Sequence, residues 1–213
     1  MRVICIGTGP SLTPEALELI NASEYPKFVC NNAYRDVDHP TALLACNPEW
    51  WDYYYPRDER LRDAAFSTWT WDRATADKYG LSYIRGEWGD GLSRDDGVIH
   101  YGHSSGYQLL GLAYHHVKHE PSEIVLIGYD LRYPRGYDGI KQVIGDGQRH
   151  YFGEYPKELQ HWTKFNMGSD GELNGLLECY RTINPSDYDL RIINCSPDSA
   201  LDFFETGELA DYA

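Results

Sequence analysis

The amino-acid sequence predicts an α/β fold with a mostly parallel sheet, helices on both faces and a small irregular lid. Short apolar runs bounded by turn residues recur along the chain, and several are apolar at consecutive positions, as parallel strands covered on both faces require. Helical patterns lie between these runs, and this alternation is typical of parallel α/β sheets that bind ligands at the carboxyl ends of their strands. The predicted strands cover residues 3–6, 27–30, 42–46, 65–69, 82–84, 124–127 and 190–194, and the predicted helices cover residues 14–21, 48–55, 72–79, 104–117, 171–181 and 197–204.

Two stretches, residues 86–103 and 131–167, do not follow this alternation. Long irregular segments in compact domains are usually either functional or disordered. The second stretch is rich in Gly, Tyr and Pro, and its aromatic content is too high for disorder. We therefore predict that residues 131–167 form a lid-like insertion within a single domain that spans residues 1–213, since a hydrophobic content of 42% suffices for one large core.

The charge balance of the chain limits the classes of partner. Lys and Arg number 19 against 33 Asp and Glu, which gives a formal net charge of −14. General nucleic-acid binding and anionic membrane surfaces need clustered cations, so both are disfavoured, whereas a small anionic ligand at one local site is compatible. No apolar run approaches the roughly 18 to 20 residues of a membrane helix, and the five cysteines include no CxxC pair. We expect a cytoplasmic protein with no membrane contact, whose cysteines are mostly buried thiols rather than disulfides or zinc ligands.

A glycine-rich segment, residues 7–13 (GTGPSLT), follows the first predicted strand. Its glycines allow a tight turn and a close approach of the backbone to a ligand, and Ser11 or Thr13 is placed to cap a helix whose amides attract an anion. An ordinary turn into a capped helix explains the same residues. The segment is not a phosphate-binding Walker loop, because no Gly-Lys-Ser/Thr follows, and Leu12 occupies the third glycine position of the dinucleotide fingerprint.

Polar residues also follow other predicted elements. Asn31 and Asn47 end the second and third strands, where an amide suits the edge of a nucleobase or ribose, although strand termination or helix capping explains them as well. Ser104 and Ser105 open the most apolar helix and form a polar corner with its amides, and capping alone accounts for Ser104. An acid, Asp130, follows the strand at 124–127.

Taken in order, these segments resemble the pattern of the bacterial lipooligosaccharide sialyltransferases and of the phage and bacterial proteins related to them. The glycine loop is also similar to that of the archaeal pterin pyrophosphokinases. The matching segments are residues 7–12, 30–31, 47–48, 104–106, 123–130 and 194–199. The resemblance implies a Rossmann-like fold around a nucleotide sugar, possibly CMP-linked. By position, the nucleotide-site residues that it implies are Gly9, Ser11, Asn31, Asn47, Ser104, Ser105 and Gly128, and Gly7, Thr8 and Asp130 are further candidates for the same site.

The resemblance also implies catalytic residues in the lid. In that family a histidine beyond the lid acts as general base on the acceptor hydroxyl, and lid tyrosines stabilise the leaving phosphate. By position the base is His161, with His150 as the rival, and packing of either histidine within the lid is the alternative. The phosphate tyrosine falls on Arg132, with Tyr133 next to it and Tyr151 as the second candidate.

We therefore expect a glycosyltransferase-like enzyme that takes a nucleotide sugar with a pyrimidine base and passes the glycosyl group to an unknown acceptor, without a metal or other cofactor. A magnesium-dependent pyrophosphokinase, with Asp130 as the most plausible ligand, and a non-catalytic nucleotide-binding phage protein are the alternatives. The two Asp-x-Asp pairs of the chain match the number expected by chance and predict no metal site. A phage-encoded protein would lie in the host cytoplasm, and a homo-oligomer is compatible with the apolar helix after Gly106 or the aromatic run at residues 50–55.

Overall fold

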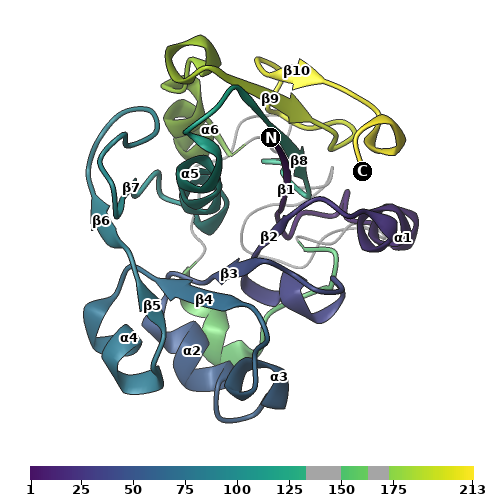
Figure 1. Ribbon diagram of the computed structural model, residues 1–213. Helices are drawn as coiled ribbons and strands as arrows, with labels where there is room; N and C mark the ends of the chain where they lie inside the picture. The colour runs from purple at the N-terminus through teal and green to yellow at the C-terminus, as the bar shows by residue number, and fades with distance from the viewer. Residues whose placement is uncertain (133–149, 163–172) are drawn as a thin grey trace.

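The computed structural model describes residues 1–132, 150–162 and 173–213. An eight-stranded sheet forms its centre, in the order β10-β9-β8-β1-β2-β3-β4-β5, and every neighbouring pair in it is parallel (Figure 1). The strands are β1 (Arg2–Ile6), β2 (Lys27–Cys30), β3 (Ala42–Leu44), β4 (Ser67–Thr70), β5 (Ser82–Tyr83), β8 (Ser122–Ile127), β9 (Leu190–Asn194) and β10 (Glu205–Thr206). The predicted α/β fold with a Rossmann-like parallel sheet is confirmed.

Helices cover both faces of the sheet. Successive side chains of a strand point to opposite faces, so Val3 and Cys5 enter a core formed with α5 and α6, whereas Ile4 and Ile6 enter a second core formed with α1 and α2. Figure 1 shows α5 and α6 on one side of the strands and α1 on the other. The helices are α1 (Pro14–Ala22), α2 (Pro48–Tyr54), α3 (Glu59–Arg62), α4 (Arg73–Tyr79), α5 (Ser105–Val117) and α6 (Asn174–Arg181), and the 3₁₀ helices are η1 (Asn31–Arg35), η2 (Lys157–Trp162), η3 (Pro185–Tyr188) and η4 (Leu209–Asp211).

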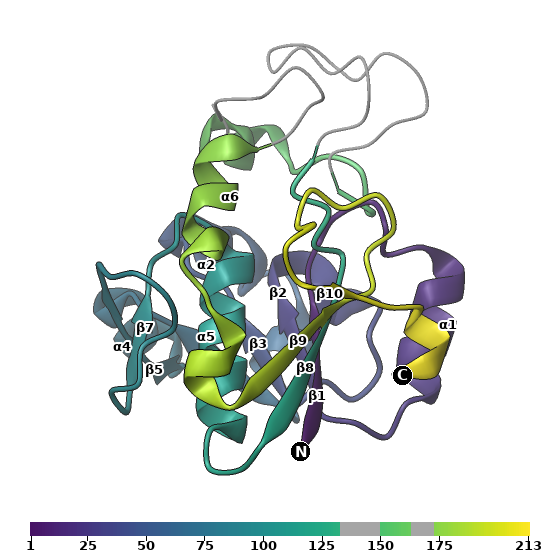
Figure 2. The same cartoon turned by 90° about the horizontal axis from the view of Figure 1, so that it is seen from above.

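The order of the strands contains one reversal. From β1 the chain proceeds outward through β2, β3, β4 and β5, and then returns to the other side of β1 as β8, followed by β9 and β10. Figure 2 shows β1, β8 and β9 side by side and running in the same direction. The boundary between β1 and β8 is therefore the switch point of the sheet, where open α/β sheets bind ligands at the carboxyl ends of their strands.

The stretch 86–103 forms a second, small sheet in which β6 (Arg85–Glu87) pairs in parallel with β7 (Val98–His100). Strand β7 also lies against α5, the most buried helix. The departure of this stretch from the alternation thus reflects an accessory sheet beside the main one.

The predicted helix at residues 197–204 is wrong, because these residues form turns that lead into β10. Side chains bond the local backbone in place of a helical ladder: the side-chain Oδ1 of Asn194 accepts from the Ser196 N–H at 3.1 Å, and the Ser199 hydroxyl accepts from the Leu201 N–H at 3.1 Å. Asp198 adopts a left-handed backbone with φ 55°. Such local side-chain bonds compete with helix formation.

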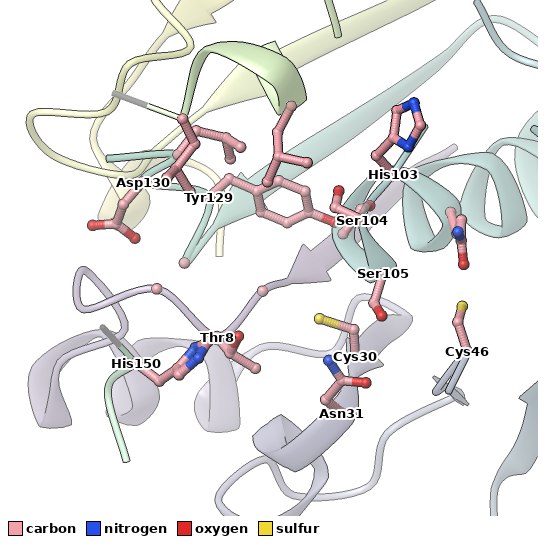
Figure 3. Close-up of a pocket in the computed structure, with 18 of the residues that line it drawn as sticks. Thr8, Cys30, Asn31, Cys46, His103, Ser104, Ser105, Tyr129, Asp130 and His150 are labelled. Carbon is pink, nitrogen blue, oxygen red and sulfur yellow. Dashed lines mark hydrogen bonds between the residues drawn. The ribbon is translucent and has the colours of Figure 1, made fainter. Parts of the chain in front are cut away.

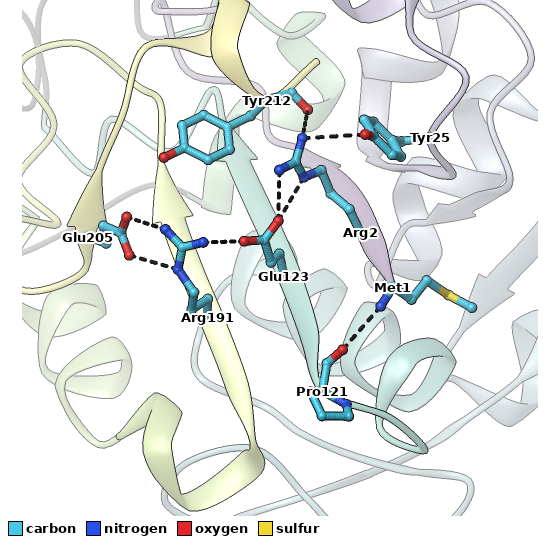
Figure 4. A network of polar contacts seen from close by, with 8 residues as sticks. All are labelled: Met1, Arg2, Tyr25, Pro121, Glu123, Arg191, Glu205 and Tyr212. Atoms are coloured by element: carbon cyan, nitrogen blue, oxygen red, sulfur yellow. Dashed lines mark hydrogen bonds and ion pairs between the residues drawn. The ribbon is translucent and has the colours of Figure 1, made fainter.

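Charged side chains link the amino ends of the central strands. Glu123 on β8 accepts from Arg2 on β1 at 2.9 Å and pairs with Arg191 on β9, which in turn bonds Glu205 on β10 at 3.0 Å (Figure 4). The hydrogen bond from Arg191 lowers the pKa of the Glu205 carboxyl, and the Glu205 carboxylate in turn raises the pKa of Arg191. The network therefore links four neighbouring strands at the amino end of the sheet.

Of the predicted lid, the structure describes residues 131–132 and 150–162; the rest of 131–167 lies outside the described residues. The described part is tied to the glycine loop, since the Tyr151 N–H donates to the Thr8 carbonyl at 3.1 Å. None of the helices described in the structure has both the length and the hydropathy needed to cross a membrane.

Candidate functional site

A cavity of about 900 Å³ opens at the switch point of the sheet. Its walls come from the residues that follow β1, β2, β3 and β8, and from the first turn of α5 (Figure 3). The size and the position are those of a ligand site in a parallel α/β protein. The residues from the predicted site that line it are Gly7, Thr8, Gly9, Asn31, Asn47, Ser104, Ser105, Gly128, Asp130, Arg132 and His150.

The glycine loop is shaped by its contact with the end of β8. A Cβ on Gly7 would lie 2.3 Å from the Gly128 carbonyl oxygen, and one on Gly9 would lie 1.8 Å from an Asp130 carboxylate oxygen. The Gly9 N–H donates to the Gly128 carbonyl at 2.9 Å, and the Ser11 N–H donates to Asp130 at 3.0 Å. Because these two N–H groups already donate to Gly128 and Asp130, they are not free to bind a ligand. The loop lines the cavity with its glycine backbone and with Thr8.

The first helix is capped without any ligand. Thr13, not Ser11, is the cap of α1, and its hydroxyl accepts from the Ala16 N–H at 3.2 Å. Ser11 instead donates from its hydroxyl to Asp130 at 2.8 Å and accepts from the Gly128 N–H at 3.2 Å. Ser11 therefore lies behind the wall of the cavity, where it braces Asp130.

Asp130 is a buried carboxyl group whose pKa is raised. Burial raises its pKa from the ordinary value of 3.8 to about 6, and the two bonds from Ser11 offset part of that rise. A carboxyl group that titrates near neutrality in a cavity can exchange a proton with a ligand. Its negative charge at higher pH also opposes an anion held nearby.

The first turn of α5 offers open hydrogen-bond donors to the cavity. Ser104 caps the helix by accepting from the Tyr107 N–H at 3.1 Å, and its hydroxyl lies 3.3 Å from the Tyr180 hydroxyl. The N–H groups of Ser105 and Gly106 have no acceptor among the described residues, as expected for the first residues of a helix. Two open amides at the positive end of a 13-residue helix suit a phosphate group.

His150 reaches the cavity from the described part of the lid. Its Nδ1 lies 3.1 Å from the Thr8 hydroxyl, and its ring stacks on Phe152 with centroids 5.0 Å apart and an angle of 1°. Tyr155 contacts the same ring edge-on at 5.0 Å. Figure 3 shows His150 beside Thr8, on the side of the cavity where Asp130 lies. The imidazole is therefore held in one orientation, as a general base requires.

The two asparagines differ in their surroundings. Asn31 begins η1 with φ 46°, a left-handed conformation that asparagine tolerates, and its amide contacts the Tyr155 hydroxyl. Asn47 precedes α2 but makes no side-chain capping bond. Capping therefore does not explain the Asn47 side chain, which lines the cavity.

One predicted catalytic residue, Tyr151, lies outside the cavity lining, and its hydroxyl donates to Asp36 at 2.6 Å. Tyr133 falls outside the described residues, and His161 belongs to η2, with its side chain outside the description. Arg132 lines the cavity directly after Leu131.

Sequence reasoning missed an aromatic part of the wall. Trp71, Trp88, Tyr101, His103 and Gln108 all line the cavity. For Trp88, Tyr101 and His103 the only signal in the sequence is the aromatic content of the irregular stretch 86–103, because their placement depends on how β6 and β7 fold back beside α5. The other lining residues that were missed are Pro10, Cys30, Cys46, Glu49, Gly106, Tyr129, Leu131, Tyr155, Leu173, Leu176 and Tyr180.

The thiols of the cavity are not nucleophiles. Cys30 and Cys46 are buried, as the sequence predicted for them and for Cys5 and Cys195. Burial raises the pKa of Cys30 to about 12 and that of Cys46 further still. Both thiols are therefore protonated at neutral pH and lack the thiolate that nucleophilic chemistry needs. Within residues 1–132, 150–162 and 173–213, no three His, Cys, Asp or Glu side chains are grouped so as to hold a metal ion.

Comparisons with protein-family models, curated proteins and solved structures yielded no match to this chain.

Proposed function

We propose that the protein is a glycosyltransferase-like enzyme that binds a nucleotide sugar, with a pyrimidine base, and transfers the glycosyl group to an acceptor. The observation that carries the proposal is the pair of open amides, Ser105 and Gly106, which face a large cavity at the switch point of a parallel sheet. Such a position favours a phosphorylated, nucleotide-like ligand. A cytoplasmic location and a homo-oligomeric state are further expectations of the proposal.

The phosphates of the donor would be held at the first turn of α5. The hydroxyls of Ser104 and Ser105 add donors to the two open amides there, and the helix dipole favours negative charge. The amides of Gly7, Gly9 and Ser11 in the glycine loop do not bind the phosphates, because they already donate to the residues at the end of β8. The bare backbone of the loop leaves room for the sugar or base beside Thr8.

His150 is the proposed general base. The acceptor hydroxyl oxygen would form a bond to the anomeric carbon of the donor, while the bond from that carbon to the phosphate oxygen breaks and its electron pair stays on the leaving nucleotide. The hydroxyl proton would pass to the imidazole, which the Thr8 hydroxyl and the Phe152 ring hold in place. The amides of α5 would stabilise the charge that develops on the phosphate.

A thermal-shift screen tests the proposal. The ligands are CMP, CDP, UDP, GDP and ATP, their sugar conjugates and the matched nucleosides, each with magnesium and with EDTA. At 100-fold excess over Kd a ligand adds about 2.7 kcal/mol of stability, which corresponds to a midpoint shift of roughly 5 to 10 °C for a chain of this size.

A shift with a pyrimidine nucleotide and its sugar conjugate, equal with magnesium and with EDTA and absent with the nucleoside, is the expected result. A shift only with ATP and magnesium would replace the proposal with the pyrophosphokinase alternative. The absence of a shift with every nucleotide would refute nucleotide binding. Binding of the donor without turnover of any acceptor would favour a non-catalytic nucleotide-binding protein.

A further inference from the structure

One end of the cavity is an aromatic wall, which we define as Trp71, Trp88, Tyr101 and His103. The ring centroids of Trp71 and Tyr101 lie 5.2 Å apart, those of Trp88 and Tyr101 5.0 Å, and those of Trp88 and His103 5.1 Å. These residues follow β4, β6 and β7, so the accessory sheet positions most of the wall. Figure 3 shows His103 and Cys46 on the opposite side of the cavity from Asp130 and His150.

Trp88 has an exposed ring in a fixed position. Its side chain is 72% exposed, whereas the next most exposed large hydrophobic residue of the described chain, Met1, is 51% exposed. The contacts with Tyr101 and His103 are tilted, at 66° and 53°, and they hold the ring at the mouth of the cavity. A large aromatic surface kept open to solvent beside a cavity indicates a binding surface.

Two buried polar atoms near the wall lack partners. Gln108 is 5% exposed, and its Nε2 donates to the Tyr101 carbonyl at 2.7 Å, but its Oε1 accepts from no group. The indole N–H of Trp71 also lacks a hydrogen-bond partner and lies beside the Cys46 sulfur, a weak acceptor. An unsatisfied buried polar atom is costly. Hydroxyl groups of a ligand could satisfy both atoms, because a hydroxyl can donate to the Gln108 Oε1 and accept from the Trp71 N–H.

The charge of the lining favours a neutral ligand at this end. Among the described lining residues, Arg132 is the one Lys or Arg, and it follows Asp130 at the β8 side of the cavity. The lining also includes Glu49, which comes after Asn47 at the β3 side. Among the described lining residues the aromatic wall contains no Lys or Arg, so an anionic group there would lack a side-chain cation to offset its desolvation.

We propose that the aromatic wall binds a neutral sugar ring, at a subsite across the cavity from His150. The C–H face of the ring packs on Trp88, and ring hydroxyls bond the open Oε1 of Gln108 and the indole N–H of Trp71. This sugar site rests on the wall and its two open polar atoms, and it does not depend on the proposed transferase activity.

Ligand-observed NMR and calorimetry with neutral methyl glycosides of glucose, galactose and N-acetylglucosamine test the site, with glucuronate and sialic acid as charged comparisons. The variants are Trp88→Ala and Trp88→Phe, and Tyr25→Ala is a control at an exposed aromatic residue outside the cavity. Gln108→Met removes the open acceptor at similar volume, and its thermal midpoint reports whether the fold is kept.

We expect at least one neutral glycoside to bind more tightly than both charged sugars. Trp88→Ala should lower its affinity about tenfold through lost stacking, while Trp88→Phe and Tyr25→Ala stay within about threefold of the wild type. Equal affinity in Trp88→Ala and Trp88→Phe, or no binding of any neutral glycoside to the wild type, would overturn the site.

The same samples are screened with nucleotides, so that the two proposals fail separately. A nucleotide shift without neutral glycoside binding overturns the sugar site and leaves the proposed function intact. Binding of a glycoside that depends on Trp88, without a nucleotide shift, supports the sugar site and refutes the transferase.

Discussion

Polar groups are paired at the amino ends of the central strands, whereas several polar groups at the carboxyl ends have no partner among the described residues. At the amino end, Arg2, Glu123 and Arg191 pair with one another and with Glu205 across four strands (Figure 4). At the carboxyl end of the same sheet, two amides of α5 and a buried Gln108 oxygen have no partner among the described residues, and burial raises the pKa of Asp130.

This difference separates a structural edge from a functional one. Folding alone favours the satisfied arrangement, because unpaired buried polar groups and shifted pKa values cost stability. An edge that keeps such groups open, around a cavity, is arranged for a ligand that completes their hydrogen bonds.

His150→Asn should lower turnover by a factor of about 10² to 10⁴, the usual contribution of a general base, while the nucleotide-induced thermal shift is kept. The assay uses the donor that the nucleotide screen identifies. His161→Asn is measured in parallel, because the sequence assigned the base to either histidine. Wild-type turnover in His150→Asn would exclude His150 as the base, and a loss confined to His161→Asn would transfer the role.

Gly128→Ala should lower the free energy of unfolding by about 2 to 4 kcal/mol. Gly128 has φ 75°, and a Cβ there would lie 2.9 Å from the backbone of Gly7, so the junction between β1 and β8 must shift. Gly175→Ala is the matched control, since a Cβ at that helical position meets nothing within 4 Å. Urea unfolding measures both variants, and similar losses in the two would contradict the role of the junction.

Asp130 should make the stability of the protein fall as the pH rises from about 4 to about 6. The folded protein holds this proton more tightly than the unfolded chain, because burial raises the pKa from 3.8 to about 6. The stabilisation is complete below the unfolded pKa and is lost as the pH passes the folded pKa, a difference of about 3 kcal/mol in total. Urea unfolding across this range should show the wild type losing stability relative to Asp130→Asn; parallel profiles would contradict the assignment.

Glu123→Gln should lower the free energy of unfolding by about 1 kcal/mol, and the effect should shrink at high salt. Glu123 is 24% exposed and pairs with two arginines, so its charge is partly shielded from solvent. Glu59→Gln is the control, because that carboxylate is 86% exposed and pairs with Arg62 at 3.7 Å. A change of equal size in the control would remove any special role for the network.

The sequence predicts the sheet well where burial is two-sided. The strands around β1 and β8 are apolar at consecutive positions, and that local pattern is enough to identify them. The segment 197–204 shows the limit of such patterns. The Ser199 hydroxyl donates to the Tyr129 carbonyl, a contact that only the folded protein makes, and it accepts from the Leu201 N–H in place of a helical bond.

The candidate site was predictable in part. Residues directly after a strand, such as Asn31, Asn47 and Asp130, must gather at one edge of a parallel sheet, and the structure brings them to one cavity. The reason for the second glycine of the loop was not predictable from the local motif. A side chain at Gly9 would collide with the carboxylate of Asp130, which lies 121 positions later in the sequence. Trp88 and its neighbours were missed, since the parallel pairing of β6 with β7 gives no local signal.

The most direct test of a phosphate site at the carboxyl edge is to remove one amide donor from α5. Proline is tolerated at the first helical position, and Ser104 before it has the extended backbone (φ −145°, ψ 146°) that a residue preceding proline prefers. Ser105→Pro therefore deletes an N–H group at a position compatible with the fold, whereas Ser105→Ala keeps that group and removes the hydroxyl alone.

Calorimetry compares the nucleotide that gives the largest thermal shift with its nucleoside in both variants. Ser105→Pro should weaken nucleotide binding at least about tenfold relative to Ser105→Ala, the cost of one hydrogen bond to a charged group, and leave nucleoside binding and the thermal midpoint unchanged. Equal nucleotide affinity in the two variants would contradict the account.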